Sequence, residues 1–93
     1  MAEAKQVRAI VRGRVQGVCF RAWTRETAEQ LGLAGWVRNC PDGSVELFAQ
    51  GDAADLEKFL GLCEKGPPAA QVANVERHWE SKHEVFSGFE IRR

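Results

Sequence analysis

The stretch that decides the fold is GWVRNCPDGSVELFAQ, from Gly35 to Gln50. Its centre, Pro41-Asp42-Gly43, has strong turn chemistry, because proline presets φ, aspartate bonds to nearby backbone and glycine accepts positive φ. The runs on either side, residues 35–39 and 44–50, are therefore predicted to be two strands joined as a β-hairpin. The residues of the second strand that we predict to face the core are Val45, Leu47 and Ala49.

A helical pattern lies on each side of this hairpin. Before it, larger side chains recur at three- and four-residue steps, which predicts a helix that ends at Gly32. Its predicted stripe is Phe20, Trp23, Thr27 and Leu31. After the hairpin, a second helix is predicted from about Asp52, its capping residue, to Lys65, and Gly66-Pro67-Pro68 ends it. Its predicted stripe is Leu56, Phe59, Leu60 and Cys63.

Strands are predicted towards both ends of the chain. Residues Lys5 to Arg12 alternate, with Val7, Ala9 and Val11 on one face. A strand of imperfect alternation is predicted from Val72 to Glu80, and a short closing strand from Phe89 to Ile91. Without the short closing strand, the order is strand–helix–strand–strand–helix–strand. It predicts an α+β ferredoxin-like sandwich, in which two helices cover one face of an antiparallel sheet. We expect residues 1–93 to form a single domain, since no repeat or linker interrupts them.

The composition limits the classes of function. Basic and acidic side chains number 13 each, so the formal net charge is zero. Nucleic-acid-binding proteins usually carry a basic excess, so we expect no nucleic-acid partner. No apolar run approaches the roughly 20 residues that span a bilayer, and Met1 to Lys5 lacks the apolar stretch of a signal peptide. We therefore expect a cytoplasmic protein without a membrane partner, and a monomer by default.

The cysteines and histidines suggest no metal centre, and the tryptophans suggest no nucleic-acid-binding surface. The three cysteines are odd in number and lack metal-ligand spacing, which predicts free thiols, no disulfide and no zinc. His78 and His83 are predicted to be surface or packing residues. The tryptophans are predicted to be core and sheet-face residues rather than a base-stacking platform; they are Trp23, Trp36 and Trp79.

The loop between the first strand and the first helix is predicted to bind an anion. It reads Gly13-Arg14-Val15-Gln16-Gly17-Val18-Cys19-Phe20-Arg21. Its two glycines permit positive φ, so successive N–H groups can converge at the positive end of the helix. Arg21 lies in the first turn, where the helix dipole disfavours a cation by roughly 0.3–1 kcal/mol, and a bound phosphate would reverse that effect. The alternative is a plain tight connection, with Arg21 in solvent or paired with Glu26.

Two familiar phosphate loops are excluded by the residues present. No Gly-Lys-Ser/Thr ending is found, so the loop is not a nucleotide-binding P-loop. A single residue separates Cys19 from Arg21, which is too few for the backbone of a cysteine-nucleophile phosphatase loop to wrap between them. We predict that Cys19 is a small apolar residue turned into the core. From spacing alone, Asn39 is predicted only to shape the turn before Pro41.

The loop and the segment Gly35-Trp36-Val37-Arg38-Asn39 together resemble the acylphosphatases. The resemblance covers nearly the whole chain from about Lys5, through Gly66-Pro67-Pro68-Ala69, to Gly88-Phe89-Glu90-Ile91-Arg92. It implies a ferredoxin-like enzyme that hydrolyses a small-molecule acyl phosphate to a carboxylate and inorganic phosphate, with no metal or organic cofactor. It also implies that Asn39 positions the attacking water and that Arg21 binds the phosphoryl group. The loop residues whose backbone it implies in phosphate binding are Gln16, Gly17, Val18, Cys19, Phe20 and Arg21.

Two other functions remain open. A non-catalytic anion-binding or regulatory module would keep the same loop without the hydrolytic step. An RNA-recognition module has the same order of elements, but this chain lacks its aromatic strand signature and its basic surface. Release of phosphate from an acyl phosphate separates the enzyme from both.

Overall fold

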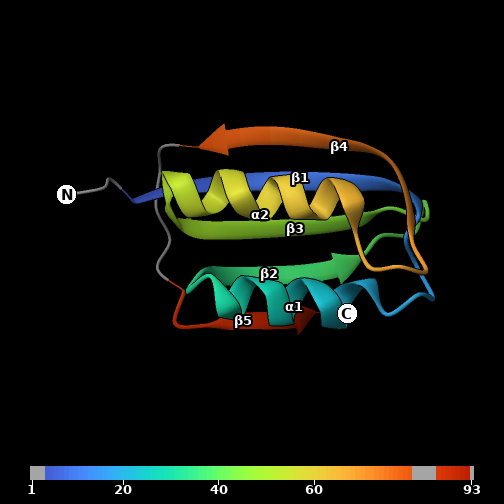
Figure 1. Cartoon of the computed structure of the whole chain (residues 1–93), viewed down its shortest axis with the longest axis horizontal. Helices are drawn as coiled ribbons and strands as arrows, with labels where there is room; N and C mark the ends of the chain where they lie inside the picture. Colours follow the sequence, from blue (N-terminus) through green and yellow to red (C-terminus); the bar gives the residue numbers. More distant parts are fainter. Residues whose placement is uncertain (1–3, 81–85, 93) are drawn as a thin grey trace.

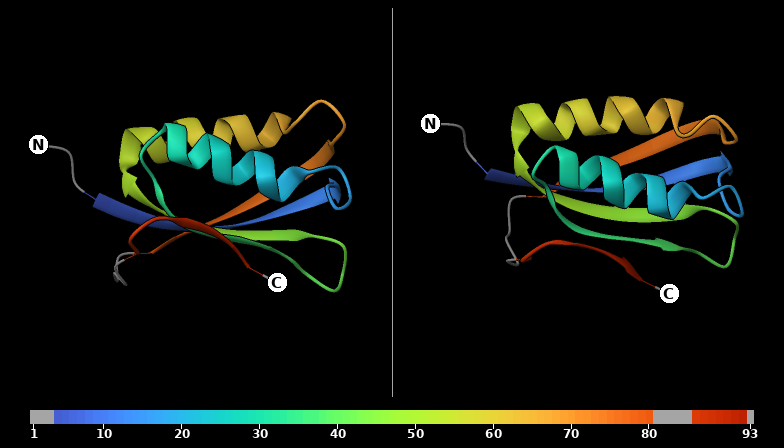
Figure 2. Two further views of the ribbon diagram at one scale, coloured as in Figure 1. Left: turned by 90° about the horizontal axis from the view of Figure 1, so that it is seen from below. Right: turned by 60° about the horizontal axis from the view of Figure 1, so that its bottom comes forward.

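The computed structural model describes residues 4–80 and 86–92 of the chain, and their elements form one sheet and two helices (Figure 1). Both helices lie on the same face of the sheet, as the two turned views in Figure 2 show. In chain order the elements are β1 (Ala4–Arg14), α1 (Phe20–Gln30), β2 (Ala34–Asn39), β3 (Val45–Asp52), α2 (Ala53–Lys65), β4 (Gln71–Glu80) and β5 (Phe89–Arg92).

The sheet has the strand order β4-β1-β3-β2-β5. The pairs β1–β3, β1–β4 and β2–β3 are antiparallel, which confirms the ferredoxin-like prediction for these four strands. The antiparallel prediction is wrong for β5, because β5 pairs with β2 in parallel, from Gly35 opposite Phe89 to Arg38 opposite Arg92. The strand directions explain this difference. β4 ends at the end of the sheet where β2 begins, so a chain that returns along the far edge runs in the direction of β2.

The core lies between the helices and the sheet, where the alternation of β1 and β3 places it. The predicted core faces of both strands are buried: Val7, Ala9, Val11, Val45, Leu47 and Ala49. The predicted stripe of α2 is buried along its whole length as well: Leu56, Phe59, Leu60 and Cys63. Burial in this core raises the pKa of the Cys63 thiol to about 12.

The buried stripe of α1 differs from the prediction. Its buried residues are Phe20, Thr24 and Ala28, whereas Trp23, Thr27 and Leu31 are only partly buried. The side chains of Thr24 and Ala28 are small, so α1 can approach the sheet closely along this line. The Thr24 hydroxyl loses little by burial because it donates a hydrogen bond to the carbonyl oxygen of Phe20, at 2.8 Å. The prediction followed the large side chains of α1, so after Phe20 it identified residues beside the buried stripe instead of the small residues that form it.

The helix ends mostly follow the predicted signals. Gly32 directly follows the C-cap of α1 with φ of 71°, and Gly66 is the C-cap of α2 with φ of 68°. Both angles lie in the left-handed region that glycine adopts without strain. Asp52 does occupy the N-cap position of α2, but its side chain makes no capping hydrogen bond. Neither helix in the described part of the chain is long and apolar enough to cross a membrane.

Candidate active site

A β-bulge lies near the end of β1, just before the loop that follows this strand. The register between β1 and β4 shifts between Arg12 and Gly13, so that Ala73 is an extra residue in β4. The extra residue explains the imperfect alternation predicted for β4, because it changes the side of the sheet on which the neighbouring side chains lie. Gly13 is required here: its φ is 128°, and a Cβ atom would lie 2.2 Å from the carbonyl oxygen of Gln71. The loop itself is anchored by Val15 and Phe20, each with a relative exposure of 1%.

The backbone of this loop presents N–H groups at the N-terminus of α1. Gly17 has φ of 75°, which confirms the predicted positive φ, and Cys19 is the N-cap with φ of 60° and ψ of 24°. The first helical hydrogen bond runs from the N–H of Trp23 to the carbonyl oxygen of Cys19, at 3.0 Å. Among the described residues, no acceptor takes a hydrogen bond from the N–H groups of residues 16–19. These groups can therefore bind an anion.

The position of Cys19 corrects one prediction. Its side chain is exposed and not turned into the core. The reason is that the buried stripe of α1 starts at Phe20, so the N-cap residue lies outside it. The left-handed backbone of Cys19 is the one positive φ among the described non-glycine residues. Such a conformation is strained for a residue with a Cβ atom, and strained residues concentrate at functional sites.

Arg21 brings a cation to the same loop. It is the second residue of α1, it is half-buried, and the first turn contains no acidic residue. The alternative pairing with Glu26 is not observed. Within the ranges 4–80 and 86–92, the Arg21 side chain makes no hydrogen bond or ion pair. Its charge therefore lies uncompensated beside the positive end of the helix, an arrangement that favours an anionic ligand.

Asn39 comes from the opposite side of the site, at the end of β2. It shares the helix-facing side of the sheet with Val37, two residues earlier, which is fully buried. The turn that follows closes without the Asn39 side chain: the N–H of Cys40 donates to the carbonyl oxygen of Ser44 at 2.9 Å. Asp42 Oδ1 accepts from the Ser44 hydroxyl at 2.6 Å and from its N–H at 2.9 Å. These hydrogen bonds lower the pKa of Asp42, and none of them involves the Asn39 side chain.

One cavity joins these parts. Figure 1 shows the first turn of α1 and the arrowhead of β2 at the same end of the molecule. Between them lies a cavity of about 160 Å³ that both Arg21 and Asn39 line. Ile91 of β5 adds an apolar wall. Its role could not be predicted from the sequence, since alternation with Phe89 gives its face but not its neighbouring strand. The lining residues are Val15, Cys19, Phe20, Arg21, Ala22, Asn39 and Ile91.

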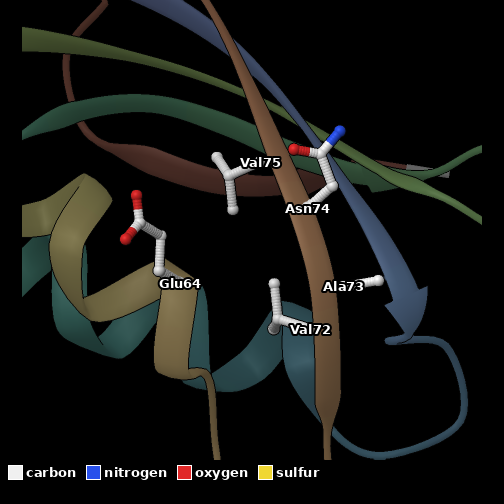
Figure 3. Close-up of a pocket in the computed structure, with 5 residues that line it drawn as sticks. All are labelled: Glu64, Val72, Ala73, Asn74 and Val75. Carbon is white, nitrogen blue, oxygen red and sulfur yellow. The ribbon is translucent and has the colours of Figure 1, made fainter.

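A larger hollow elsewhere offers less chemistry. It has a volume of about 310 Å³ and lies between the end of α2 and β4, lined by Glu64 and by residues 72–75. In Figure 3, Val72 and Val75 point towards α2, whereas Ala73 points away from it. Glu64 is the charged group of this hollow, and it pairs with Arg77. Apart from this paired carboxylate and the amide of Asn74, the lining side chains are aliphatic, so the hollow has no cationic group to bind an anion.

The remaining candidate residues form no second site. Among the residues that the structure describes, no group of three or more His, Cys, Asp or Glu could hold a metal ion. His78 lies at the surface, 3.7 Å from Glu76, and His83 lies outside the described residues. Trp36 is a sheet-face residue as predicted: it stacks on Phe48 with ring centroids 6.1 Å apart. Trp23 packs partly buried against the core, whereas Trp79 is 44% exposed.

Comparison with known proteins identifies the family. A family model described as acylphosphatase matches residues 7–91. The chain is 49% identical over 90 residues to an acylphosphatase of Rubrobacter xylanophilus, a match that covers 97% of this chain and 82% of that one. It is 53% identical over 87 residues to an acylphosphatase of Rhizobium meliloti, covering 91% and 92%. The crystal structure of acylphosphatase from Bacillus subtilis has a TM-score of 0.94 and 37% identity, covering 96% of this chain and 99% of that one. The chain therefore belongs to the acylphosphatase family.

Proposed function

We propose that Arg21, the loop N–H groups and Asn39 carry out the acyl phosphate hydrolysis for which this enzyme family is named. The chain is a hydrolase of the carboxyl–phosphate bond. In our proposal, the backbone of residues 16–21 and the Arg21 guanidinium bind the phosphoryl group, and the Asn39 amide holds the attacking water. The observation that carries the proposal is that Arg21 and Asn39 line the same cavity as the start of α1.

Acyl phosphate hydrolysis suits a site that stabilises negative charge and aligns the reacting groups. The leaving group of an acyl phosphate is a carboxylate, which departs without a general acid. Phosphoryl transfer through a loose transition state needs mainly alignment and stabilisation of charge on the equatorial oxygens. The preorganised N–H groups and the guanidinium supply that stabilisation. The proton of the attacking water passes to the substrate phosphate, so this mechanism assigns no proton transfer to a protein side chain.

Asn39 is suited to orient a water molecule. An amide both donates and accepts hydrogen bonds, and it is too weak a nucleophile to compete with the water. Within residues 4–80 and 86–92, the Asn39 side chain makes no hydrogen bond, so both its polar atoms are available. Ile91 forms the apolar wall beside it, and would limit the water that surrounds the reacting group.

The test is hydrolysis of benzoyl phosphate by the purified protein in the presence of EDTA. We expect Asn39→Ala to lower kcat by at least about a hundredfold while calorimetry still detects binding of inorganic phosphate. We expect Arg21→Ala to remove both turnover and phosphate binding. Arg25→Ala, an exposed arginine one turn further along α1, is the matched control and should retain wild-type activity. Full activity in Asn39→Ala would contradict the role proposed for Asn39.

A non-catalytic anion-binding module gives a different result in the same experiment. The wild-type protein would bind inorganic phosphate in calorimetry, with Arg21→Ala abolishing binding, but would release no phosphate from benzoyl phosphate. The exposed N-cap Cys19 and the unpaired Arg21 are compatible with either outcome, so the turnover measurement decides between them.

We also propose a single-domain monomer in the cytoplasm. The five strands form one sheet, and both helices contribute to the same core, which supports a single domain. Trp79 is the one exposed large apolar side chain among the described residues, which offers little apolar surface for a stable dimer. The three cysteines are free, as suits a reducing compartment. Sedimentation at micromolar concentration should give the mass of one chain.

A further inference from the structure

The side chain of Gln16 connects the phosphate-binding loop to the β2–β3 hairpin. Its Nε2 atom donates one hydrogen bond to the carbonyl oxygen of Cys40 and another to that of Ser44, each at 2.8 Å. A side-chain amide nitrogen carries two N–H donors, so both are used. The two acceptors are 24 and 28 residues away in sequence.

The two carbonyls belong to the part of the hairpin that carries Asn39. Cys40 directly follows Asn39, and the carbonyl of Ser44 also accepts the hydrogen bond from the Cys40 N–H, at 2.9 Å. Cys40, Ser44 and the Gln16 amide therefore form one connected group of hydrogen bonds beside Asn39. A shift of the Gln16 side chain away from this group would move the loop relative to the end of β2.

Among the described residues, no other side-chain hydrogen bond joins the loop to the hairpin. No other side chain of residues 15–19, all of which the structure describes, makes a hydrogen bond. The ion pair between Arg12 and Asp42 also reaches the hairpin turn, but it starts before the loop, is 3.4 Å long and is largely exposed. An exposed pair of this kind contributes little. The Gln16 hydrogen bonds are shorter and partly buried.

We infer that Gln16 is a positioning residue that holds the phosphate-binding backbone in register with the water held by Asn39. The inference rests on the proposed function, since it concerns the same site. Gln16 contributes its backbone N–H to the loop, whereas its side chain points to the hairpin and fixes the geometry between the two halves of the site. The acceptors are backbone carbonyls, so this connection depends on the fold of the hairpin and not on which side chains stand at positions 40 and 44.

The consequence is a separation of turnover from phosphate binding. The phosphate ligands proposed here all lie on one continuous segment, residues 16–21, and keep their mutual geometry when that segment moves. In-line attack depends instead on the distance between that segment and Asn39, and a displacement of about 1 Å in such a geometry costs on the order of a hundredfold in rate.

The experiment compares two substitutions at Gln16 with a matched control. Gln16→Met keeps the length of the side chain and removes both donors, and Gln16→Glu places a carboxylate against the two carbonyls. The control is Gln50→Met, because Gln50 is another half-buried glutamine, whose Oε1 accepts a hydrogen bond from the Phe86 N–H far from the loop. For each protein, kcat and KM for benzoyl phosphate, the inhibition constant of inorganic phosphate and the thermal midpoint are measured.

We expect Gln16→Met to lower kcat by about ten- to a hundredfold, with the phosphate inhibition constant changed by less than about threefold and a cooperative thermal transition retained. We expect Gln50→Met to keep the wild-type kcat. If Gln16→Glu does not fold, Gln16→Met alone decides the question, because it introduces no buried charge.

Two results would overturn the inference while leaving the proposed function intact: a kcat for Gln16→Met within about twofold of wild type, or equal losses in kcat and in phosphate binding. The second would mean that Gln16 merely supports the loop. An absence of turnover in the wild-type protein would refute the proposed function, and with it the role of Gln16.

Discussion

The sharpest stability prediction concerns Gly13, where β1 passes β4 just before the loop. In Gly13→Ala the new Cβ atom would lie 2.2 Å from the carbonyl oxygen of Gln71 and 2.7 Å from the amide nitrogen of Ala73. Both are backbone atoms of β4, so neither can rotate away. The φ of 128° adds a strained backbone conformation, which costs about 1–3 kcal/mol for a residue other than glycine. Separating the two strands costs about 1–3 kcal/mol more.

The expected loss in the free energy of unfolding is therefore at least about 2 kcal/mol. In a domain of this size each kcal/mol shifts the thermal midpoint by about 4–8 °C, so calorimetry should show a decrease of at least about 8 °C. Gly32→Ala is the control: its φ of 71° is also positive, but no atom lies within 4 Å of the added Cβ. It should lose only about 1 kcal/mol. Equal midpoints for the two variants would refute the close approach of β1 and β4 at Gly13.

Two further predictions concern ionisable groups. Burial would raise the pKa of Glu46, but hydrogen bonds from Arg38 and Arg8 outweigh it and lower the pKa below the ordinary value of 4.5. The stability that Glu46 contributes is thus present above pH 4.5 and lost as the pH falls through the lowered pKa. In urea unfolding at pH 7, Glu46→Gln should lower the free energy of unfolding by about 1–3 kcal/mol. The control Glu90→Gln, at an exposed ion pair, should lower it by close to nothing. The pKa of Cys63 is raised from 9.0 to about 12, so this thiol stays protonated at pH 8 and should react with a thiol reagent only after unfolding. The contribution of the Cys63 thiol to stability is complete below pH 9 and declines between pH 9 and about 12. Reaction of Cys63 in the folded protein at the rate of an exposed thiol would contradict its burial.

Most of the fold could be predicted from local patterns. The hairpin turn follows from Pro41-Asp42-Gly43, and the structure closes it with Asp42 and Gly43. The alternation of β1 and the stripe of α2 identify their buried faces, because an element that packs on one side repeats its apolar residues with its own period. For α1 the same reasoning was less accurate, because small residues, Thr24 and Ala28, provide its closest packing.

Some features of the candidate site could be predicted from the sequence, and others could not. The glycines of the loop and the position of Arg21 at a helix N-terminus are local features, and the resemblance to a family added Asn39. The exposure of Cys19 could not be read from the sequence, since a cysteine is compatible with burial or exposure and the N-cap conformation decides between them.

By itself, the sequence determined the elements, most of their buried faces and the loop that can hold an anion, because each depends on residues within a few positions of one another. Only the tertiary structure decided that β5 runs parallel to β2, that Ile91 walls the cavity and that Gln16 reaches Cys40 and Ser44. Contacts between residues far apart in the chain form when the helices and the sheet pack together, and no local period in the sequence records them.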